Sequence, residues 1–211
     1  MSEASLFAEP IANDGFRHWP RLLDAREQAA LLGEIRAVLE AAPLYRPTMP
    51  RSGAPLSVLM SNAGPLGWVT DREGYRYQPQ HPATGRLWPA MPPIALDLWR
   101  RLSGYPALPE ACLVNYYAGG ARMGLHQDRD EPAFDAPVLS ISLGESAIFR
   151  LGGRERRGPA RTLRLDSGDA MMLAGASRMN FHGIDRLLPG TSALLPEGGR
   201  FNLTLRRVNR P

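Results

Sequence analysis

The sequence contains no lysine and one cysteine, Cys112, among its 211 residues. A lone cysteine excludes an intrachain disulfide and leaves no thiolate cluster for zinc or an iron–sulfur centre. The apolar runs fall well short of the ~20 residues that cross a bilayer, so no membrane span is predicted. The N-terminus has no basic region followed by an apolar run, which argues against a secretory signal and predicts a cytoplasmic location.

Every one of the 25 basic residues is an arginine, and the formal net charge is +4. A positive surface lowers the free energy of approach to a polyanion such as nucleic acid. An all-arginine composition is explained equally well by a GC-rich genome. The positions of the arginines, rather than their number, must therefore indicate whether they bind phosphate.

The length and the ordinary composition, 44% hydrophobic and 22% charged, predict one globular domain with a sizeable core. Apolar residues at helical spacing predict a helix over 25–42, with Asp24 as N-cap and Pro43 just beyond its end. A second helix is predicted over 93–102, which begins with a proline and stops before Gly104. Both elements precede the region of strand character.

Residues 43–92 combine proline, glycine and serine with large aromatic side chains, a mixture that predicts a structured, loop-rich lid. After Pro109 the sequence pattern changes to short segments with the residue types of β-strands, separated by turn residues. These segments are 112–117, 138–143, 147–151, 162–165, 170–173 and 201–207. Such a pattern favours a sandwich or a jelly roll over a parallel α/β sheet. We expect one compact, mainly β domain, with the helices and lid in 1–108 and the jelly-roll core in 109–211.

His126 and Asp128 are candidate metal ligands because residues two apart on an extended segment project from the same face. This H-x-D spacing is weak evidence on its own, and it needs a third ligand. His182 can supply that ligand from the segment after the expected strand 170–173. Two imidazoles and one carboxylate leave coordination positions open, as in non-haem Fe(II) oxygenases. One alternative is that the two histidines are structural and that Asp128 forms a turn. Another is a structural zinc site, although protein ligands usually occupy all the coordination positions of such a site.

The segment 200–206 is a candidate anion-binding strand. Strand alternation places Arg200, Asn202, Thr204 and Arg206 on one face. A guanidinium is a good bidentate partner for a carboxylate, and 2-oxoglutarate offers one carboxylate to an arginine while its 2-oxo acid end chelates iron. The alternative is an edge strand whose polar face lies in water.

Several segments, taken together in their order and spacing, resemble AlkB, the family of Fe(II)- and 2-oxoglutarate-dependent dioxygenases that repair alkylated DNA. The principal segments are 115–118, 125–131, 140–144 and 200–206. The likeness continues upstream through 60–62, 66–68, 74–75 and 88–92, so it covers the chain from about residue 45 onward. The family's fold is a double-stranded β-helix with a nucleotide-recognition lid, in agreement with the expectation from the strand pattern.

The resemblance implies roles for the residues already singled out. The implied iron ligands are His126, Asp128 and His182. The implied 2-oxoglutarate contacts are Arg200 and Arg206 at its two ends, with supporting donors from Asn115, Tyr117 and Asn202. Fe(II) is then the cofactor, and 2-oxoglutarate and O2 are co-substrates.

The resemblance also implies a substrate pocket, in which Trp68 and His126 sandwich the damaged base. The remaining implied contacts are Met60 to the substrate, Tyr75 to a phosphate, Asp130 to the exocyclic group of the base and Arg156 near the substrate. The alternatives are core packing for Trp68 and Tyr75 and a solvated loop for Arg156.

The departures from the family fall on the substrate side. Pro50 and Ala54 stand where the family's best-known member has a threonine and a tyrosine in its lid, and Arg129 replaces a lysine. Lid shape and base preference are therefore expected to differ, whereas the iron and 2-oxoglutarate positions are intact.

The resulting prediction is oxidative dealkylation of bases such as N1-methyladenine and N3-methylcytosine in DNA, and also in RNA, with release of an aldehyde, succinate and CO2. The base must be flipped out or presented in a single strand to reach the iron. The competing hypotheses are an oxygenase with the same machinery acting on RNA, protein or a small molecule, and a catalytically silent jelly roll that binds nucleic acid. No dimerisation helix is evident, so a monomer is expected.

Overall fold

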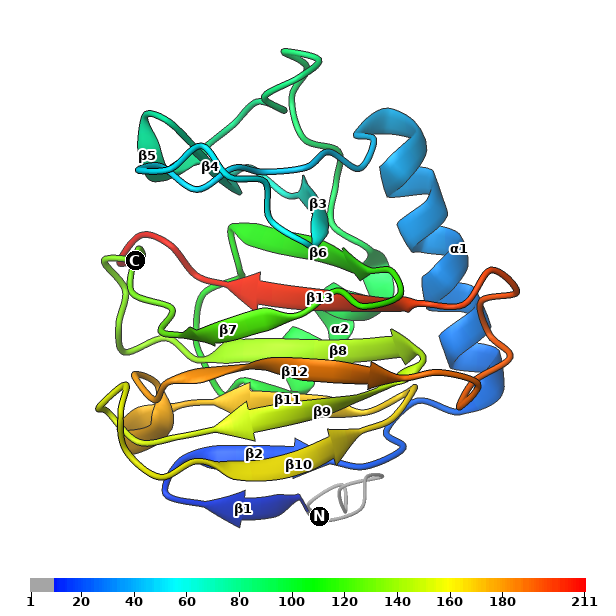
Figure 1. Ribbon diagram of the computed structural model, residues 1–211, viewed down its shortest axis with the longest axis vertical. Helices are drawn as coiled ribbons and strands as arrows, with labels where there is room; N and C mark the ends of the chain where they lie inside the picture. The colour runs from blue at the N-terminus through cyan, green and yellow to red at the C-terminus, as the bar shows by residue number, and fades with distance from the viewer. Residues whose placement is uncertain (1–9) are drawn as a thin grey trace.

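The computed structural model describes residues 10–211, which fold into two facing antiparallel sheets flanked by helices (Figure 1). The major sheet has the strand order β1-β2-β11-β8-β13-β6-β3, and the minor sheet has the order β10-β9-β12-β7. The strands of the major sheet are β1 Ile11–Asn13, β2 Phe16–Trp19, β11 Ala170–Leu173, β8 Val138–Gly144, β13 Arg200–Arg206, β6 Ala111–Tyr117 and β3 Leu59–Ala63. The strands of the minor sheet are β10 Arg161–Leu165, β9 Ser146–Leu151, β12 His182–Leu188 and β7 Met123–His126.

The apolar side chains between the two sheets form one of the hydrophobic cores. Phe149 and Ile184 of the minor sheet belong to the same buried cluster as Leu113, Val138 and Met171 of the major sheet. Alternate side chains of each strand point toward the facing sheet and fill the core between them. Two antiparallel sheets packed in this way are the architecture of a jelly roll. The predicted fold class is confirmed.

Two helices cover the outer face of the major sheet. Helix α1 spans Ala25–Ala41, and Asp24 and Glu27 form a reciprocal capping box at its start. Helix α2 spans Pro93–Leu102 and is followed by Gly104 in the left-handed region, at φ 62°. Both predicted helices are therefore confirmed. Within residues 10–211, no helix is long and apolar enough to cross a membrane.

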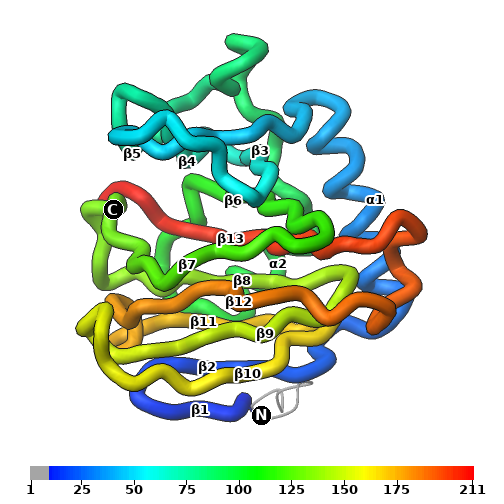
Figure 2. Tube along the Cα trace, in the orientation of Figure 1, coloured from blue at the N-terminus to red at the C-terminus, as the bar shows by residue number. Residues whose placement is uncertain are grey.

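The lid is more regular than the sequence suggested. Strands β4, Gly67–Asp71, and β5, Gly74–Gln78, form a separate two-stranded hairpin, which lies above the major sheet in Figure 1. Strand β3 pairs with β6, and β2 pairs with β11. The major sheet thus takes strands from both sides of residue 108, where the sequence predicted the core to begin. The tube in Figure 2 follows these early segments into the sheet.

Strand β13 lies in the middle of the major sheet, between β8 and β6. The side chains of Phe201, Leu203 and Leu205 belong to a second hydrophobic core, which lies between the major sheet and the two helices. The alternate residues Arg200 and Arg206 point the other way and are only 1% and 5% exposed. The alternative interpretation of this segment as an edge strand in water is wrong, because both edges of the strand are hydrogen-bonded.

Candidate metal centre and substrate pocket

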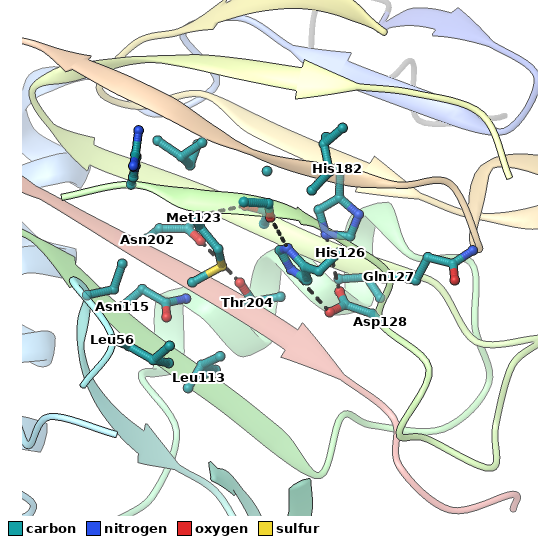
Figure 3. Close-up of a pocket in the computed structure, with 18 of the residues that line it drawn as sticks. Leu56, Leu113, Asn115, Met123, His126, Gln127, Asp128, His182, Asn202 and Thr204 are labelled. Atoms are coloured by element: carbon teal, nitrogen blue, oxygen red, sulfur yellow. Dashed lines mark hydrogen bonds and ion pairs between the residues drawn. The ribbon is translucent and has the colours of Figure 1, made fainter. Parts of the chain in front are cut away.

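All of the site residues predicted from the sequence line one cavity of about 690 Å³ between the sheets and the lid. They are Met60, Trp68, Tyr75, Asn115, Tyr117, His126, Asp128, Asp130, Arg156, His182, Arg200, Asn202 and Arg206. Figure 3 shows the polar side chains of β13 along one wall and the two histidines with Asp128 gathered at one end. Residues far apart in the chain are therefore brought to one place.

The two histidines are neighbours on adjacent strands of the minor sheet. His126 ends β7 and is the direct register partner of His182, the first residue of β12. Asp128 lies two residues beyond the end of β7, and not on the strand as the spacing argument assumed. The side-chain ligand atoms of the three residues nevertheless lie within 4.8 Å of one another.

Backbone carbonyls orient both imidazoles. Nδ1 of His126 lies 3.0 Å from the carbonyl oxygen of Gly124, and Nδ1 of His182 lies 3.0 Å from that of Asn180. If each Nδ1 carries the proton, Nε2 is left with a free lone pair. Both Nε2 atoms face Asp128, at 3.9 Å and 3.7 Å from its carboxylate oxygens. Three electron-pair donors therefore converge on one point.

The charges around this cluster favour the protonation states that bind a metal. Burial alone would raise the pKa of Asp128, but the charges of Arg206, His182 and His126 hold it well below its ordinary value. Burial, with repulsion from His126, lowers the pKa of His182 to about 4. At neutral pH the aspartate is thus ionised and His182 is neutral.

The donor set fits Fe(II). Oδ2 of Asp128 is buried and has no hydrogen-bond partner within the described part of the chain. An ionised oxygen without a partner is costly in a protein interior, so this atom is suited to a cation. Two imidazoles and one carboxylate on one side, with a large cavity on the other, match the ligand set of mononuclear non-haem iron sites.

Arg200 provides the clearest sign of an anionic ligand. It is 1% exposed, its Nη2 donates to Ser142 Oγ at 2.8 Å, and its guanidinium lies 5.5 Å from the ring centre of Tyr117. Among residues 10–211, its Nε and Nη1 have no hydrogen-bond partner. Burial lowers its pKa. A buried, under-paired cation that lines a cavity is a binding site for a carboxylate.

The expected supporting donors behave differently from one another. Asn115 lines the cavity with a buried Oδ1 that has no partner among the residues described. The amide nitrogen of Asn202 already donates to Ser140 Oγ and to the Ile141 carbonyl, at 2.6 and 3.1 Å. Asn202 therefore ties β13 to β8 in this structure, and its two donors are engaged. The Tyr117 hydroxyl contacts the sulfur of Met123 at 3.8 Å.

The lid presents an aromatic platform at the cavity. The rings of Trp68 and Tyr75 are stacked, with centres 5.7 Å apart and planes 19° apart. The Trp68 indole donates to the Asp130 carboxylate at 2.8 Å, so the lid and the loop after β7 touch here. Met60 is 1% exposed, and Arg156 also lines the cavity but has an exposed side chain.

Sequence reasoning missed a buried ion network beside the metal centre. Glu131 pairs with Arg178 at 2.9 Å, accepts a short hydrogen bond from Tyr77 of β5 and lies 3.5 Å from Arg206. Arg206 in turn donates to Asp128 at 2.8 Å. Glu131 stood in an acidic loop in the sequence, and only the fold reveals its partners. The network links the lid to a metal-ligand candidate through three consecutive contacts.

A jelly roll with two histidines and one aspartate facing a cavity, and a buried arginine within it, defines a mononuclear non-haem iron oxygenase that uses a 2-oxo acid. The family model for the 2OG-Fe(II) oxygenase superfamily matches residues 15–206, and the chain belongs to this superfamily.

Relatives in bacteria support this assignment over the whole chain. The alpha-ketoglutarate-dependent dioxygenase AlkB homolog of Caulobacter vibrioides is 55% identical over 206 residues, covering 96% of this chain and 92% of its own length. Alpha-ketoglutarate-dependent dioxygenase AlkB of Escherichia coli is 40% identical over 214 residues, covering 100% and 97%. The solved structure of OsALKBH1 superposes with a TM-score of 0.77 at 29% identity, covering 93% and 98%.

Proposed function

We propose that this protein removes alkyl groups from the nitrogen atoms of nucleic-acid bases by Fe(II)- and 2-oxoglutarate-dependent oxidation. The observation that carries the proposal is the shared cavity, which holds the three candidate iron ligands, the under-paired Arg200 and the aromatic platform of the lid. The similarity to AlkB proteins over nearly the full chain supports the same activity.

His126, Asp128 and His182 would hold Fe(II), and Arg200 would bind the distal carboxylate of 2-oxoglutarate. Fe(II), 2-oxoglutarate and O2 together supply the oxidising power that hydroxylates the N-alkyl carbon, with release of succinate and CO2. The hydroxylated product loses an aldehyde and leaves the restored base. The protein's own contribution is to orient the reactants and to exclude water from them.

The lid residues favour a flat, positively charged base. Trp68 offers a π-face, and stacking of this kind contributes roughly 1–3 kcal/mol per base with little sequence preference. Asp130 lies at the edge of the indole and adds a negative charge beside it. N1-methyladenine and N3-methylcytosine are cationic, and alkylation of the pairing edge makes a base easier to flip out of a duplex, so both residues select for these bases.

The direct test uses a single-stranded DNA oligonucleotide with one N1-methyladenine or N3-methylcytosine, incubated with the protein, Fe(II), ascorbate and 2-oxoglutarate in air. Mass spectrometry should show loss of the methyl group only with 2-oxoglutarate present, and no loss with His126→Ala. Succinate formation without methyl loss would move the substrate elsewhere. If neither succinate nor methyl loss is detected, the result favours a catalytically silent jelly roll that binds nucleic acid.

RNA as a second substrate and a monomeric state in the cytoplasm are parts of the same proposal. Methylated RNA oligonucleotides of the same sequence should be dealkylated in the same assay. Light scattering of the purified protein should give a mass near 23.2 kDa. A mass of twice that value would contradict the monomer without affecting the assigned chemistry.

A further inference from the structure

One hairpin carries a dense group of positive charges. Residues 150–161, here called the arginine hairpin, contain five arginines and one glutamate. The other 199 residues contain 20 arginines and 20 acidic residues, so they have no formal net charge. These 12 residues, which form the end of β9, its loop and the start of β10, therefore carry a net charge of +4. The segment 200–210 carries the same net charge, but its Arg200 and Arg206 are buried.

The charges of the arginine hairpin are exposed and unpaired. Arg150, Arg154, Arg156 and Arg157 are exposed, and the side chain of none of them forms a hydrogen bond or an ion pair with any residue in 10–211. Arg161 is fixed over the ring of Phe16, at 5.0 Å from its centre. Crowding of like charges without counterions raises the free energy of the surface, and a polyanion lowers it again.

The hairpin begins at the metal centre. Leu151 is the register partner of His182, and the backbones of Gly152 and Gly153 exchange hydrogen bonds with Phe181 at 2.8 and 2.9 Å. The side chain of Arg156 lines the cavity itself. In Figure 1 the loop between β9 and β10 lies on the same side of the molecule as the lid hairpin, whereas α1 lies on the opposite side.

We propose that the arginine hairpin binds the sugar–phosphate backbone of the strand whose base enters the cavity, on the rim that faces the lid. This inference rests on the proposed function and adds a phosphate-binding surface to it. A strand that delivers a base between Trp68 and the iron must pass its neighbouring phosphates over the rim beside His182. The hairpin supplies exposed guanidinium groups there, which bind phosphate without reading sequence.

The test compares Arg154→Gln/Arg157→Gln with Arg26→Gln/Arg36→Gln, a control pair that removes two exposed arginines from α1. Fluorescence anisotropy measures binding of a labelled 15-nucleotide single strand across a series of salt concentrations. The hairpin variant should bind about tenfold more weakly at low salt. Its slope of log K against log salt should fall by about 1.4, since each lost phosphate contact on a single strand removes about 0.7. The control should match the wild type in both affinity and slope.

The outcomes separate the two proposals. A wild-type slope in the hairpin variant overturns the phosphate-binding surface, even if the enzyme dealkylates DNA. A reduced slope together with a wild type that dealkylates no base retains the surface and rejects the proposed chemistry. A defect seen only with a duplex assigns the hairpin to the complementary strand and overturns the assignment to the strand in the cavity.

Discussion

Arg178 and Glu131 form an ion pair of 2.9 Å in which the two side chains are only 2% and 1% exposed. Arg178 also donates to the carbonyls of Asp128 and Ala136, at 2.6 and 2.9 Å, so it fixes both ends of the loop that follows β7. The carboxylate of Glu131 also accepts a hydrogen bond from the hydroxyl of Tyr77 in the lid. The pair therefore anchors the loop that carries Asp128 to both the jelly roll and the lid.

Replacement of Glu131 by glutamine should destabilise the protein strongly. The change leaves Arg178 without its countercharge, and loss of one partner from a buried pair typically costs about 3–5 kcal/mol. Urea unfolding measures this as a fall in the free energy of unfolding. Tyr77→Phe removes one hydrogen bond and should cost about 1–3 kcal/mol. Glu73→Gln, at an exposed side chain, should leave the urea midpoint unchanged; an equal loss in all three variants would refute the role of the buried pair.

Gly183 sets the spacing between the two histidine-bearing strands. A Cβ at this position would lie 2.4 Å from the Met123 carbonyl oxygen and 2.8 Å from that of Gly124, on β7. Gly183→Ala should push β7 away from β12 and weaken Fe(II) or Mn(II) binding by at least tenfold in anaerobic calorimetry. Gly124→Ala is the matched control, because its Cβ would meet nothing within 4 Å. Equal metal affinity in the two variants would show that the strand spacing is irrelevant.

Arg200→Lys should weaken 2-oxoglutarate binding. An ammonium group keeps the charge but loses the bidentate fork, so the KM for 2-oxoglutarate is expected to rise roughly tenfold or more, with a smaller effect on kcat. Succinate formation at varied 2-oxoglutarate concentration measures both constants, and circular dichroism checks the fold. Arg36→Lys on α1 should behave as wild type. An unchanged KM in Arg200→Lys would place the co-substrate carboxylate elsewhere.

Trp68→Ala should separate base recognition from co-substrate turnover. The indole lies in the lid, on the cavity wall, and is not a ligand of the metal centre. Methyl loss from the oligonucleotide should fall at least tenfold, as expected for the loss of one base-stacking contact. Succinate formation without DNA should stay near the wild-type rate. Undiminished base repair would remove Trp68 from the stacking role.

Cys112 should be inert in the folded protein. It is fully buried, and burial raises the pKa of its thiol to about 12. Ellman's reagent at pH 8 should react only after denaturation. Between the unfolded pKa of about 8.5 and the folded value, the unfolded chain releases a proton that the folded chain retains, so stability falls as pH rises. Cys112→Ala should lose less stability than wild type between pH 8 and pH 10; identical losses would contradict the shift.

The sequence predicted the helices and the central strands well, because both are strongly patterned. It did not predict β7 or β12. Gly124 and Gly183 interrupt the strand pattern of these two elements, and the contact of Gly183 with β7 explains its small size only once the fold is known. Propensity penalises a glycine in a strand, whereas close approach of two backbones requires it.

The residues of the candidate site were predicted from spacing and resemblance. The buried ion network that holds them in place was not predicted. His126, Asp128 and His182 form a recognisable pattern because metal ligands have restricted chemistry. Arg178 and Tyr77 lie 47 and 54 residues from Glu131, and nothing local marks them as its partners. Long-range ion pairs follow from the tertiary fold, so a single sequence leaves them hidden.

The alternation along β13 ties the core and the co-substrate site to a single register. A one-residue insertion before Phe201 would exchange the two faces of the strand, sending apolar side chains into the cavity and arginines into the helix-covered core. An insertion in this strand would therefore remove both the activity and the stability of the protein. Point substitutions act on one face at a time, so in related chains β13 should keep its length and register.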